Sequence, residues 1–368
     1  MPDGLPSRPA QDAPDLARAA SALTAAGGRR PARTLRSAGE LIAAGLLPEA
    51  ARAGVAAVAE RYAIAVTPEM ARLMDPADPA DPIARQYLPD PAELITAPHE
   101  LEDPTADAPF TPVKGVVHRY PDRALLKPLL ACPVYCRFCF RREAVGPDGG
   151  LLSEAELEAA LAWFAATPQV REVVLTGGDP LMLSPRRLGE VLRRLAAIPH
   201  IEILRIHSRV PVAAPRLVTA ALAEALAVEA PLYLCVHANH AREFAPAAQA
   251  ALRRLHGAGA VLLGQSVLLR GVNDSEAALE GLFRAMLRAR VKPYYLHQLD
   301  PAPGTARFHV PEAEGLALLR RLRGRVTGLA WPTYVRETPG GGGKVPILLD
   351  SGTGDAIWSS QMTMERLR

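Results

Sequence analysis

Three cysteines lie close together in the sequence, at Cys132, Cys136 and Cys139. Their spacing is Cys-x3-Cys-x2-Cys, and an aromatic residue, Phe138, precedes the last of them. Soft thiolate ligands select iron–sulfur clusters or zinc. A [4Fe–4S] cluster is normally held by four thiolates, so three would leave one iron open to bind a small molecule. The spacing therefore indicates a [4Fe–4S] cluster with an open coordination position.

A structural zinc site is the alternative interpretation of the same thiols. Such sites usually combine two short clusters of Cys or His, whereas the only other cysteine, Cys235, stands in an apolar run. We therefore expect no zinc. We also expect no disulfides, because three of the four cysteines share one loop and the start of the sequence does not resemble a secretory signal.

The composition indicates a globular protein with a sizeable core. Of the 368 residues, 49% are hydrophobic and 22% are charged, and the net charge is only +3. Arginines are spread along the chain rather than clustered, which argues against nucleic acid as a partner. No apolar stretch approaches the roughly 18 residues of a membrane span. We expect a cytoplasmic protein that binds neither nucleic acid nor membranes.

The sequence divides into four parts by composition and periodicity. Residues 1–33 are rich in Ala, Pro and Arg, which predicts a disordered tail. Residues 34–111 read as a helical lead-in and an extended linker, because the proline run at 75–82 must end any helix. Residues 112–325 hold a regular core, and residues 326–368 form a C-terminal segment with a glycine-rich run.

Short apolar runs alternate with amphipathic segments through the core, which predicts an α/β fold with a parallel sheet. Strands are expected at 125–131, 172–176, 202–207, 232–237, 261–266 and 293–299. Helices are expected at 153–166, 185–197, 216–228, 246–257, 275–290 and 312–323. Ser153 and Glu156 have the spacing of a capping box at the first of these helices. Six strand–helix units fit a partial (βα)6 barrel better than a complete eight-stranded one.

Polar residues follow the predicted strands one after another. In parallel α/β barrels the carboxyl ends of the strands carry the active site, so these side chains should gather on one rim. In chain order they are the cysteine loop, Gly177, Gly178 and Asp179, then His207 to Arg209, His237 with Asn239, Gln265, and His297 with Asp300.

A second candidate site is the run from Pro339 through four glycines to Lys344. It is not a phosphate-binding P-loop, which needs a glycine at the position of Thr338 and a Ser or Thr at the position of Val345. A lysine held on such a loop could form a Schiff base with an aldehyde cofactor. A flexible surface loop is an equal alternative on composition alone.

Several long motifs resemble those of the lysine 2,3-aminomutase family, over roughly residues 35–350. They are the cysteine loop, residues 118–123 (HRYPDR), 265–274 (QSVLLRGVND), 293–295 (PYY) and 339–344 (PGGGGK). The resemblance implies a radical S-adenosylmethionine (SAM) enzyme that also uses pyridoxal phosphate (PLP). The expected fold is a partial (βα)6 radical SAM barrel, with an N-terminal helical extension and a C-terminal PLP-binding segment.

The resemblance also implies a role for individual residues. Cys132, Cys136 and Cys139 would ligate the cluster, and Lys344 would be the catalytic lysine that binds PLP covalently. The two arginines implied around PLP would lie near its phosphate, because the N–H groups of a guanidinium can bind two phosphate oxygens at once. Residues implied around PLP are Arg119, Tyr120 and Arg123, and those implied around SAM are Gly177, Gly178, Asp179, His237 and Gln265.

The implied reaction interconverts L-lysine and β-lysine by moving the α-amino group to Cβ. Arg141 matches the family residue that binds the substrate carboxylate. Asp300 and Glu337 match two acids that bind the distal ammonium group, although free-lysine enzymes have Asp at the second position. Two acids favour a cationic substrate over glutamate, because a buried ammonium group needs compensating charge.

Other functions stay open at this point. Glu337 and the segment 296–300 (LHQLD) resemble the branch that supplies β-lysine for modification of elongation factor P, and an aminomutase for another amino acid is possible. An iron–sulfur electron carrier or cluster-binding regulator is the non-enzymatic alternative. We expect a reductant such as flavodoxin or ferredoxin and a possible homo-oligomer. Ser275 stands where the free-lysine enzymes have a cysteine for intersubunit zinc, which puts that zinc in doubt.

Overall fold

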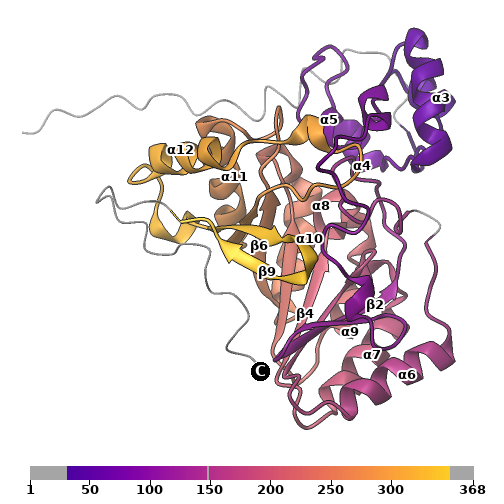
Figure 1. The fold of residues 1–368 in the computed structure, drawn as a ribbon, viewed down its shortest axis with the longest axis vertical. Coiled ribbons are helices and arrows are strands. Elements are labelled where there is room, and N and C mark those ends of the chain that lie inside the picture. Colours follow the sequence, from indigo (N-terminus) through magenta and orange to yellow (C-terminus); the bar gives the residue numbers. More distant parts are fainter. Residues whose placement is uncertain (1–30, 147–148, 349–368) are drawn as a thin grey trace, which may run out of the picture.

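The computed structural model describes residues 31–146 and 149–348 (Figure 1). The tail predicted at 1–33 lies outside the described residues apart from its last three positions. The C-terminal segment is described as far as residue 348, which includes the whole glycine-rich run.

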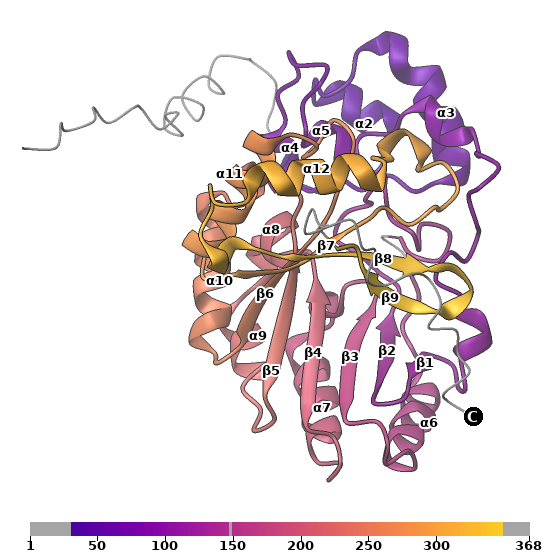
Figure 2. The ribbon, with the colours of Figure 1, turned by 60° about the vertical axis from the view of Figure 1, so that its left-hand side comes forward.

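One curved sheet of nine strands organises the described chain, and its strands follow one another in sequence order (Figure 2). Strands β2 to β8 are parallel, while β1 and β9 pair antiparallel at the two edges. The strands are β1 (Val116–Tyr120), β2 (Arg123–Leu129), β3 (Glu172–Gly177), β4 (Ile203–Ser208), β5 (Leu232–His237), β6 (Val261–Val267), β7 (Lys292–His297), β8 (Thr333–Thr338) and β9 (Gly343–Pro346).

Helices connect the parallel strands and cover the outside of the sheet (Figure 2). The six predicted strand–helix units are confirmed, and the capping box of Ser153 and Glu156 begins the first helix. The helices are α6 (Glu154–Ala165), α7 (Pro185–Ala196), α8 (Val210–Ala213), α9 (Ala220–Ala225), α10 (Pro246–Gly257), α11 (Glu276–Arg288) and α12 (Glu312–Leu322). The prediction of one helix over 216–228 was too long, because a 3₁₀ turn at Pro215–Leu217 precedes the Thr219 N-cap of α9.

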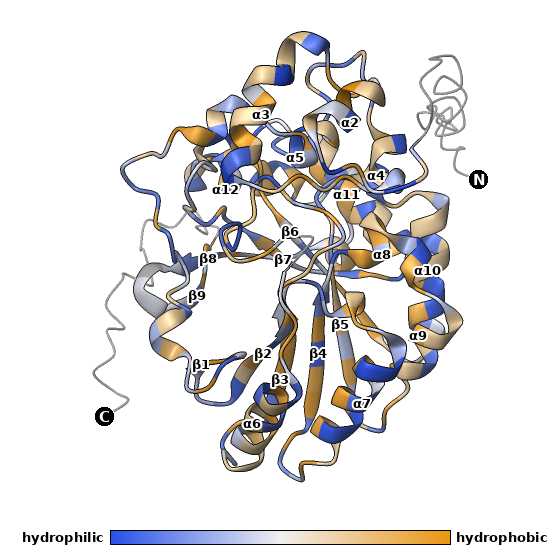
Figure 3. Cartoon of the chain, turned by 90° about the vertical axis from the view of Figure 1, so that its right-hand side faces the viewer, coloured by the Kyte–Doolittle hydropathy of each residue, from blue (hydrophilic) through white to orange (hydrophobic). Residues whose placement is uncertain are grey.

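The two edge strands approach each other, so the sheet is nearly closed (Figures 2 and 3). The Lys344 backbone N–H, on β9, donates to the Tyr120 hydroxyl on β1, with 2.7 Å between N and O. A side chain therefore bridges the two edges where no strand ladder joins them. Strands β1, β8 and β9 were not predicted from the sequence.

The N-terminal extension is helical as predicted, and it lies over the carboxyl ends of the strands (Figure 2). Ser37 caps its first helix and Thr67 caps the fourth element. The proline run at 75–82 separates the helical segments, as expected. These segments are α2 (Ala38–Ala43), η1 (Glu49–Ala51), α3 (Arg52–Arg61), α4 (Pro68–Leu73), α5 (Ala84–Tyr87), η2 (Pro91–Leu94) and η3 (Ala108–Phe110).

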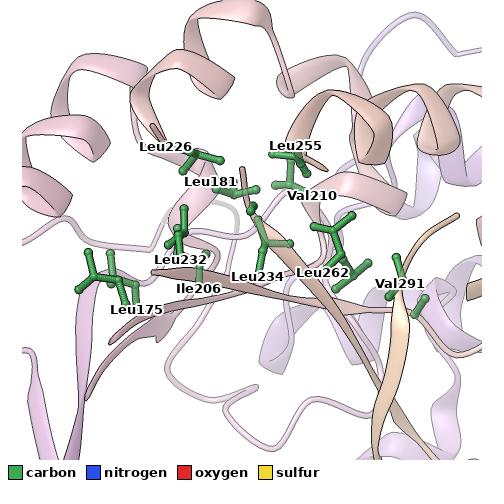
Figure 4. Close-up of a cluster of buried hydrophobic side chains, with 14 of the residues drawn as sticks. Leu175, Leu181, Ile206, Val210, Leu226, Leu232, Leu234, Leu255, Leu262 and Val291 are labelled. Carbon is green, nitrogen blue, oxygen red and sulfur yellow. The ribbon is translucent and has the colours of Figure 1, made fainter. Parts of the chain in front are cut away.

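The main hydrophobic core lies between the sheet and its outer helices (Figure 4). Leu175, Ile206, Leu234 and Leu262 are register partners on β3 to β6 and are almost completely buried. Each such side chain contributes roughly 1.5–3 kcal/mol by leaving water. Because side chains alternate along a strand, the residues between them face the interior of the curved sheet. No described helix is long and apolar enough to cross a membrane.

Candidate active site

The cysteine loop begins directly after β2, at the carboxyl edge of the sheet. The thiols of Cys132, Cys136 and Cys139 are free and partly buried. Hydrogen bonds shape the loop: the Cys139 N–H donates to the Cys136 carbonyl (3.1 Å) and the Cys132 N–H to Gly146 (3.1 Å). Burial raises the pKa of Cys136 to about 11, against the opposing charge of Arg209. The free thiol therefore stays protonated at neutral pH until a metal binds it.

Gly177 and Gly178 let the end of β3 pack directly against the start of this loop. The φ angle of Gly177 is +103°, and a Cβ on Gly178 would lie 2.3 Å from the Ala131 carbonyl oxygen. The Gly178 N–H donates to Leu129 (2.9 Å) and the Asp179 N–H to Ala131 (2.8 Å). Only glycine permits this approach. The pair thus holds the cysteine loop, and its contact with SAM stays a prediction.

The Asp179 carboxylate accepts its hydrogen bonds from groups of the protein itself. It accepts hydrogen bonds from the Ser208 hydroxyl (2.7 Å) and from the backbone N–H groups of Arg209 (2.7 Å) and Leu181 (3.1 Å). Asp179 is 3% exposed. It ties the end of β3 to the end of β4 and so shapes the rim. Its contact with SAM likewise stays a prediction.

His237 lies beside the cysteine loop and has an unused hydrogen-bonding atom. Its ring packs edge-to-face on Phe138, with 5.8 Å between centroids. Its Nε2 is buried and has no partner among the described residues. Gln265 is its register neighbour on β6. Buried polar atoms are normally paired, so an orphan beside the cysteine loop fits a polar ligand such as SAM.

Lys344 lies directly opposite Glu337 in the β8–β9 hairpin. Lys344 Nζ is 2.8 Å from Glu337 Oε2, and the lysine side chain is 33% exposed against 5% for the acid. Arg119 Nη1 is 2.9 Å from Glu337 Oε1. The angle of that contact makes it an ion pair rather than a hydrogen bond, since Oε1 has no hydrogen-bond partner among the described residues. Glu337 thus lies between two cations.

The glycine-rich run is shaped to hold Lys344 against β1. Gly340, Gly341 and Gly343 have positive φ angles. A Cβ on Gly343 would lie 2.7 Å from the Tyr120 hydroxyl oxygen, the atom that also accepts the Lys344 N–H. Alanine at these angles is strained, so glycine at these positions lets the run turn and bring the Lys344 backbone against Tyr120.

The predicted PLP residues of β1 and β2 form one stack. The guanidinium carbon of Arg123 lies 3.7 Å from the centre of the Tyr120 ring, and that of Arg119 lies 5.9 Å from it. The structure therefore brings both arginines and Tyr120 beside Lys344, which fits a cofactor that carries an aldehyde and a phosphate.

Asp300 is half-buried close to the same charges, and its carboxylate has no partner of its own among the described residues. No hydrogen bond or ion pair joins its carboxylate to another described residue. Burial raises its pKa to about 6, opposed by Lys344 and reinforced by Glu337. A cavity of about 190 Å³ is lined by Asp300 and Glu337 among others. The structure thus brings the two predicted acids together.

Asp107 was not identified from the sequence, although it contacts the predicted carboxylate-binding residue. Its Oδ2 lies 2.9 Å from Arg141 Nη2, 3.1 Å from Arg141 Nε and 3.4 Å from Lys127 Nζ. Burial alone would raise the pKa of Asp107, but Arg141 and Lys127 outweigh it and lower the pKa to about 2. No motif marked Asp107, because it lies in a segment that reads as linker.

Two further histidines face the interior. The Nε2 atoms of His207 and His297, on β4 and β7, are buried and lack partners among the described residues. Burial, helped by the charge of Lys344, lowers the pKa of His297 to about 3. Both imidazoles are therefore neutral at physiological pH and can donate or accept one hydrogen bond to a ligand. The sequence placed them at strand ends but gave them no role.

The donor set fits a cluster better than a single ion. Within residues 31–146 and 149–348, no three His, Cys, Asp or Glu residues are grouped closely enough to hold one metal ion. A [4Fe–4S] cluster has a different requirement, because each cysteine binds its own iron at a separate corner. Three free thiols on one loop suit three separate corners of such a cluster.

Comparison with known proteins agrees with this geometry. Residues 126–280 match the Radical SAM superfamily. The chain is 40% identical to L-lysine 2,3-aminomutase of Clostridium subterminale over 80% of this chain and 71% of that protein. It is 39% identical to L-lysine 2,3-aminomutase of Escherichia coli over 78% of this chain and 83% of that protein. Glutamate 2,3-aminomutase of Clostridioides difficile is 34% identical, over 79% and 69%.

These relatives are isomerases, and the similarity spans most of both chains. The electron-carrier and regulator alternatives are therefore wrong, and the protein is an enzyme that uses a [4Fe–4S] cluster and SAM. On these grounds the chain belongs to the lysine 2,3-aminomutase family of radical SAM isomerases.

Proposed function

We propose that the protein is a PLP-dependent lysine 2,3-aminomutase, which interconverts L-lysine and β-lysine. The C–N bond at Cα breaks, a C–N bond at Cβ forms, and one hydrogen moves from Cβ to Cα. The reaction is an isomerisation, so it needs no net oxidant or reductant. When bound, the reduced cluster and SAM supply a carbon radical that abstracts hydrogen, and PLP supplies the aldehyde that carries the migrating amine.

The observation that carries the choice of lysine is the unpartnered carboxylate of Asp300 beside Glu337. An ionised buried carboxylate is costly unless a cation compensates it. The distal ammonium group of lysine would supply that cation. The side-chain carboxylate of glutamate would add a third negative charge to the pair instead, which disfavours it as the substrate.

Arg141 would bind the other end of the substrate. Asp107 occupies its Nε and Nη2 atoms, which leaves the Nη1 side of the guanidinium for the α-carboxylate. Lys127 contacts the same Asp107 oxygen, so the three side chains together carry one net positive charge. That charge complements a single carboxylate, and the charge-assisted contact is among the stronger hydrogen bonds.

Glu337 would have a second role through Lys344. In the unliganded protein it accepts a hydrogen bond from Lys344 Nζ. A substrate ammonium group that binds Glu337 would compete with this contact and release Lys344 Nζ for exchange. Substrate binding and the freeing of the lysine would then be coupled through one carboxylate.

The test is a direct assay of the anaerobically reconstituted enzyme. Cluster and PLP are loaded, dithionite, SAM and L-lysine are added, and β-lysine is measured by mass spectrometry. We expect many β-lysine molecules for each SAM consumed, and no product from glutamate. SAM cleavage without β-lysine would contradict the substrate assignment while leaving the radical chemistry intact.

Parallel reactions with glutamate, ornithine and alanine would identify a different substrate, since a glutamate 2,3-aminomutase is among the relatives. Whether β-lysine is released free or supplied for modification of elongation factor P would follow from adding that factor and its ligase. A flavodoxin or ferredoxin reductant and a homo-oligomer stay predictions.

A further inference from the structure

A fully buried group of charges joins the N-terminal extension to the cysteine loop. Glu93 of η2 lies between Arg137 and Arg142, and all three side chains are 0% exposed. Arg137 Nε lies 3.0 Å from Glu93 Oε1 and 2.9 Å from Oε2, and Arg142 Nη2 donates to Oε2. One carboxylate from outside the core thus holds two arginines of the loop.

Backbone contacts extend this connection in both directions. The Arg137 N–H donates to the Gln86 carbonyl (2.9 Å), and Arg137 Nη1 donates to the Ala63 carbonyl (2.7 Å). Arg142 Nη1 contacts the carbonyl oxygens of Arg137 (3.1 Å) and Pro303 (3.3 Å). Segments far apart in the sequence therefore meet at these two side chains.

The two arginines belong to the stretch that carries the thiols. Arg137 lies between Cys136 and Cys139, and Arg142 is three residues after Cys139. Replacing a buried ion pair by apolar residues is often neutral for stability, whereas removing one partner is strongly destabilising. The stability of the fold alone therefore does not require the buried charges of Glu93, Arg137 and Arg142. Both arginines lie within three residues of an expected cluster ligand.

We propose that Glu93 is a positioning residue for the iron–sulfur centre. It holds the cysteine loop in its ligating conformation, and its negative charge offsets Arg137 and Arg142 so that the cluster keeps a low reduction potential. The potential of such clusters depends on net charge, hydrogen bonding and burial, and residues that orient metal ligands typically affect metal affinity about 10- to 100-fold. Glu93 would have this role whichever amino acid is the substrate.

The experiment compares Glu93→Gln with the wild-type chain after anaerobic reconstitution. Iron and sulfide per chain, the midpoint potential from a dithionite titration followed by electron paramagnetic resonance, and the rate of cluster loss to a chelator are measured. We expect lower occupancy, a midpoint potential shifted to a more positive value, and cluster loss about 10-fold faster or more.

Glu100→Gln is the matched control. Glu100 is a buried acid of the same extension, and it accepts backbone N–H groups of Gly304, Thr305 and Ala306 rather than arginine donors. We expect the control to keep the wild-type potential. Glu93→Asp keeps the charge but shortens the side chain, so it should keep the potential and lose the cluster faster.

A folded Glu93→Gln variant with the potential and cluster lifetime of the wild type would overturn the proposal. Should that variant fail to fold, Arg142→Gln provides the complementary measurement. Removing one positive charge while keeping Glu93 should move the midpoint potential to a more negative value. An unchanged or more positive potential in Arg142→Gln would also reject the electrostatic role.

Discussion

Asp300 lowers the stability of the folded protein at neutral pH and would bind the substrate ammonium group. Its pKa is raised from 3.8 to about 6 because burial disfavours the charged form. The unfolded chain therefore loses this proton at a lower pH than the folded chain. Stability falls as pH rises from about 4 to about 6, and the full cost is present above pH 6. The difference corresponds to about 3 kcal/mol at most.

Asp300→Asn should therefore stabilise the unliganded protein above pH 6 and have little effect near pH 4. The same change should raise the KM for lysine about 10- to 100-fold, because a hydrogen bond to a charged group is lost. Urea unfolding at pH 4.5 and 8, together with lysine kinetics at pH 8, checks both expectations. Equal stability of variant and wild type at pH 8 would mean that Asp300 carries no electrostatic cost.

At the scale of elements, the β8–β9 hairpin places Lys344 through its glycines. Gly343→Ala would put a Cβ into the Tyr120 hydroxyl at a φ of +81°, which costs roughly 1–2 kcal/mol in backbone strain alone. We expect it to displace Lys344 and to reduce the PLP that borohydride traps covalently. Gly340→Ala is the control, since it has a φ of +73° but nothing within 4 Å. Equal loss in both variants would implicate strain rather than the Tyr120 contact.

The elements that periodicity defines were predictable, and those that depend on pairing were not. β2 to β7 are short apolar runs between amphipathic helices, so their sequence alone identifies them. Three of the four residues of β9, Gly343, Lys344 and Pro346, are of types depleted in strands, and β9 exists because β8 offers a partner. The division into an extension, a core at 112–325 and a C-terminal segment stays a prediction, although the sheet continues past residue 325 into β8 and β9.

The same limit applies to the site. Motifs identified Lys344, Glu337 and Asp300, and the structure brings them together. Asp107 and Glu93 carry no motif, because a lone acid in a linker gives no periodic or spacing signal. Their importance follows only from the long-range contacts that bring the extension onto the cysteine loop and onto Arg141.

At the scale of the whole molecule, the interior of the sheet is polar where a complete barrel would be packed with apolar side chains. Inward-facing His207, His237 and His297 each have a buried nitrogen without a partner among the described residues. Asp300 adds a carboxylate without a hydrogen-bond or ion-pair partner among the described residues. Unpaired buried polar groups are costly. These side chains therefore carry a desolvation penalty that polar groups of a bound cofactor can relieve.

Binding of PLP should consequently raise the free energy of unfolding of the whole protein, and not only order the hairpin that carries Lys344. A ligand at 100 times its Kd contributes about 2.7 kcal/mol, which corresponds to a rise in Tm of about 3–4 °C for a chain of 368 residues. Differential scanning fluorimetry of the wild type and of Lys344→Ala, with inorganic phosphate as the control ligand, measures this effect. We expect the full rise only in the wild type, a smaller one in the variant, and none with phosphate. An unchanged Tm in the wild type would mean that the stack of Arg119, Tyr120 and Arg123 beside Lys344 does not form a PLP site, because a bound cofactor cannot avoid shifting the folding equilibrium toward the state that binds it.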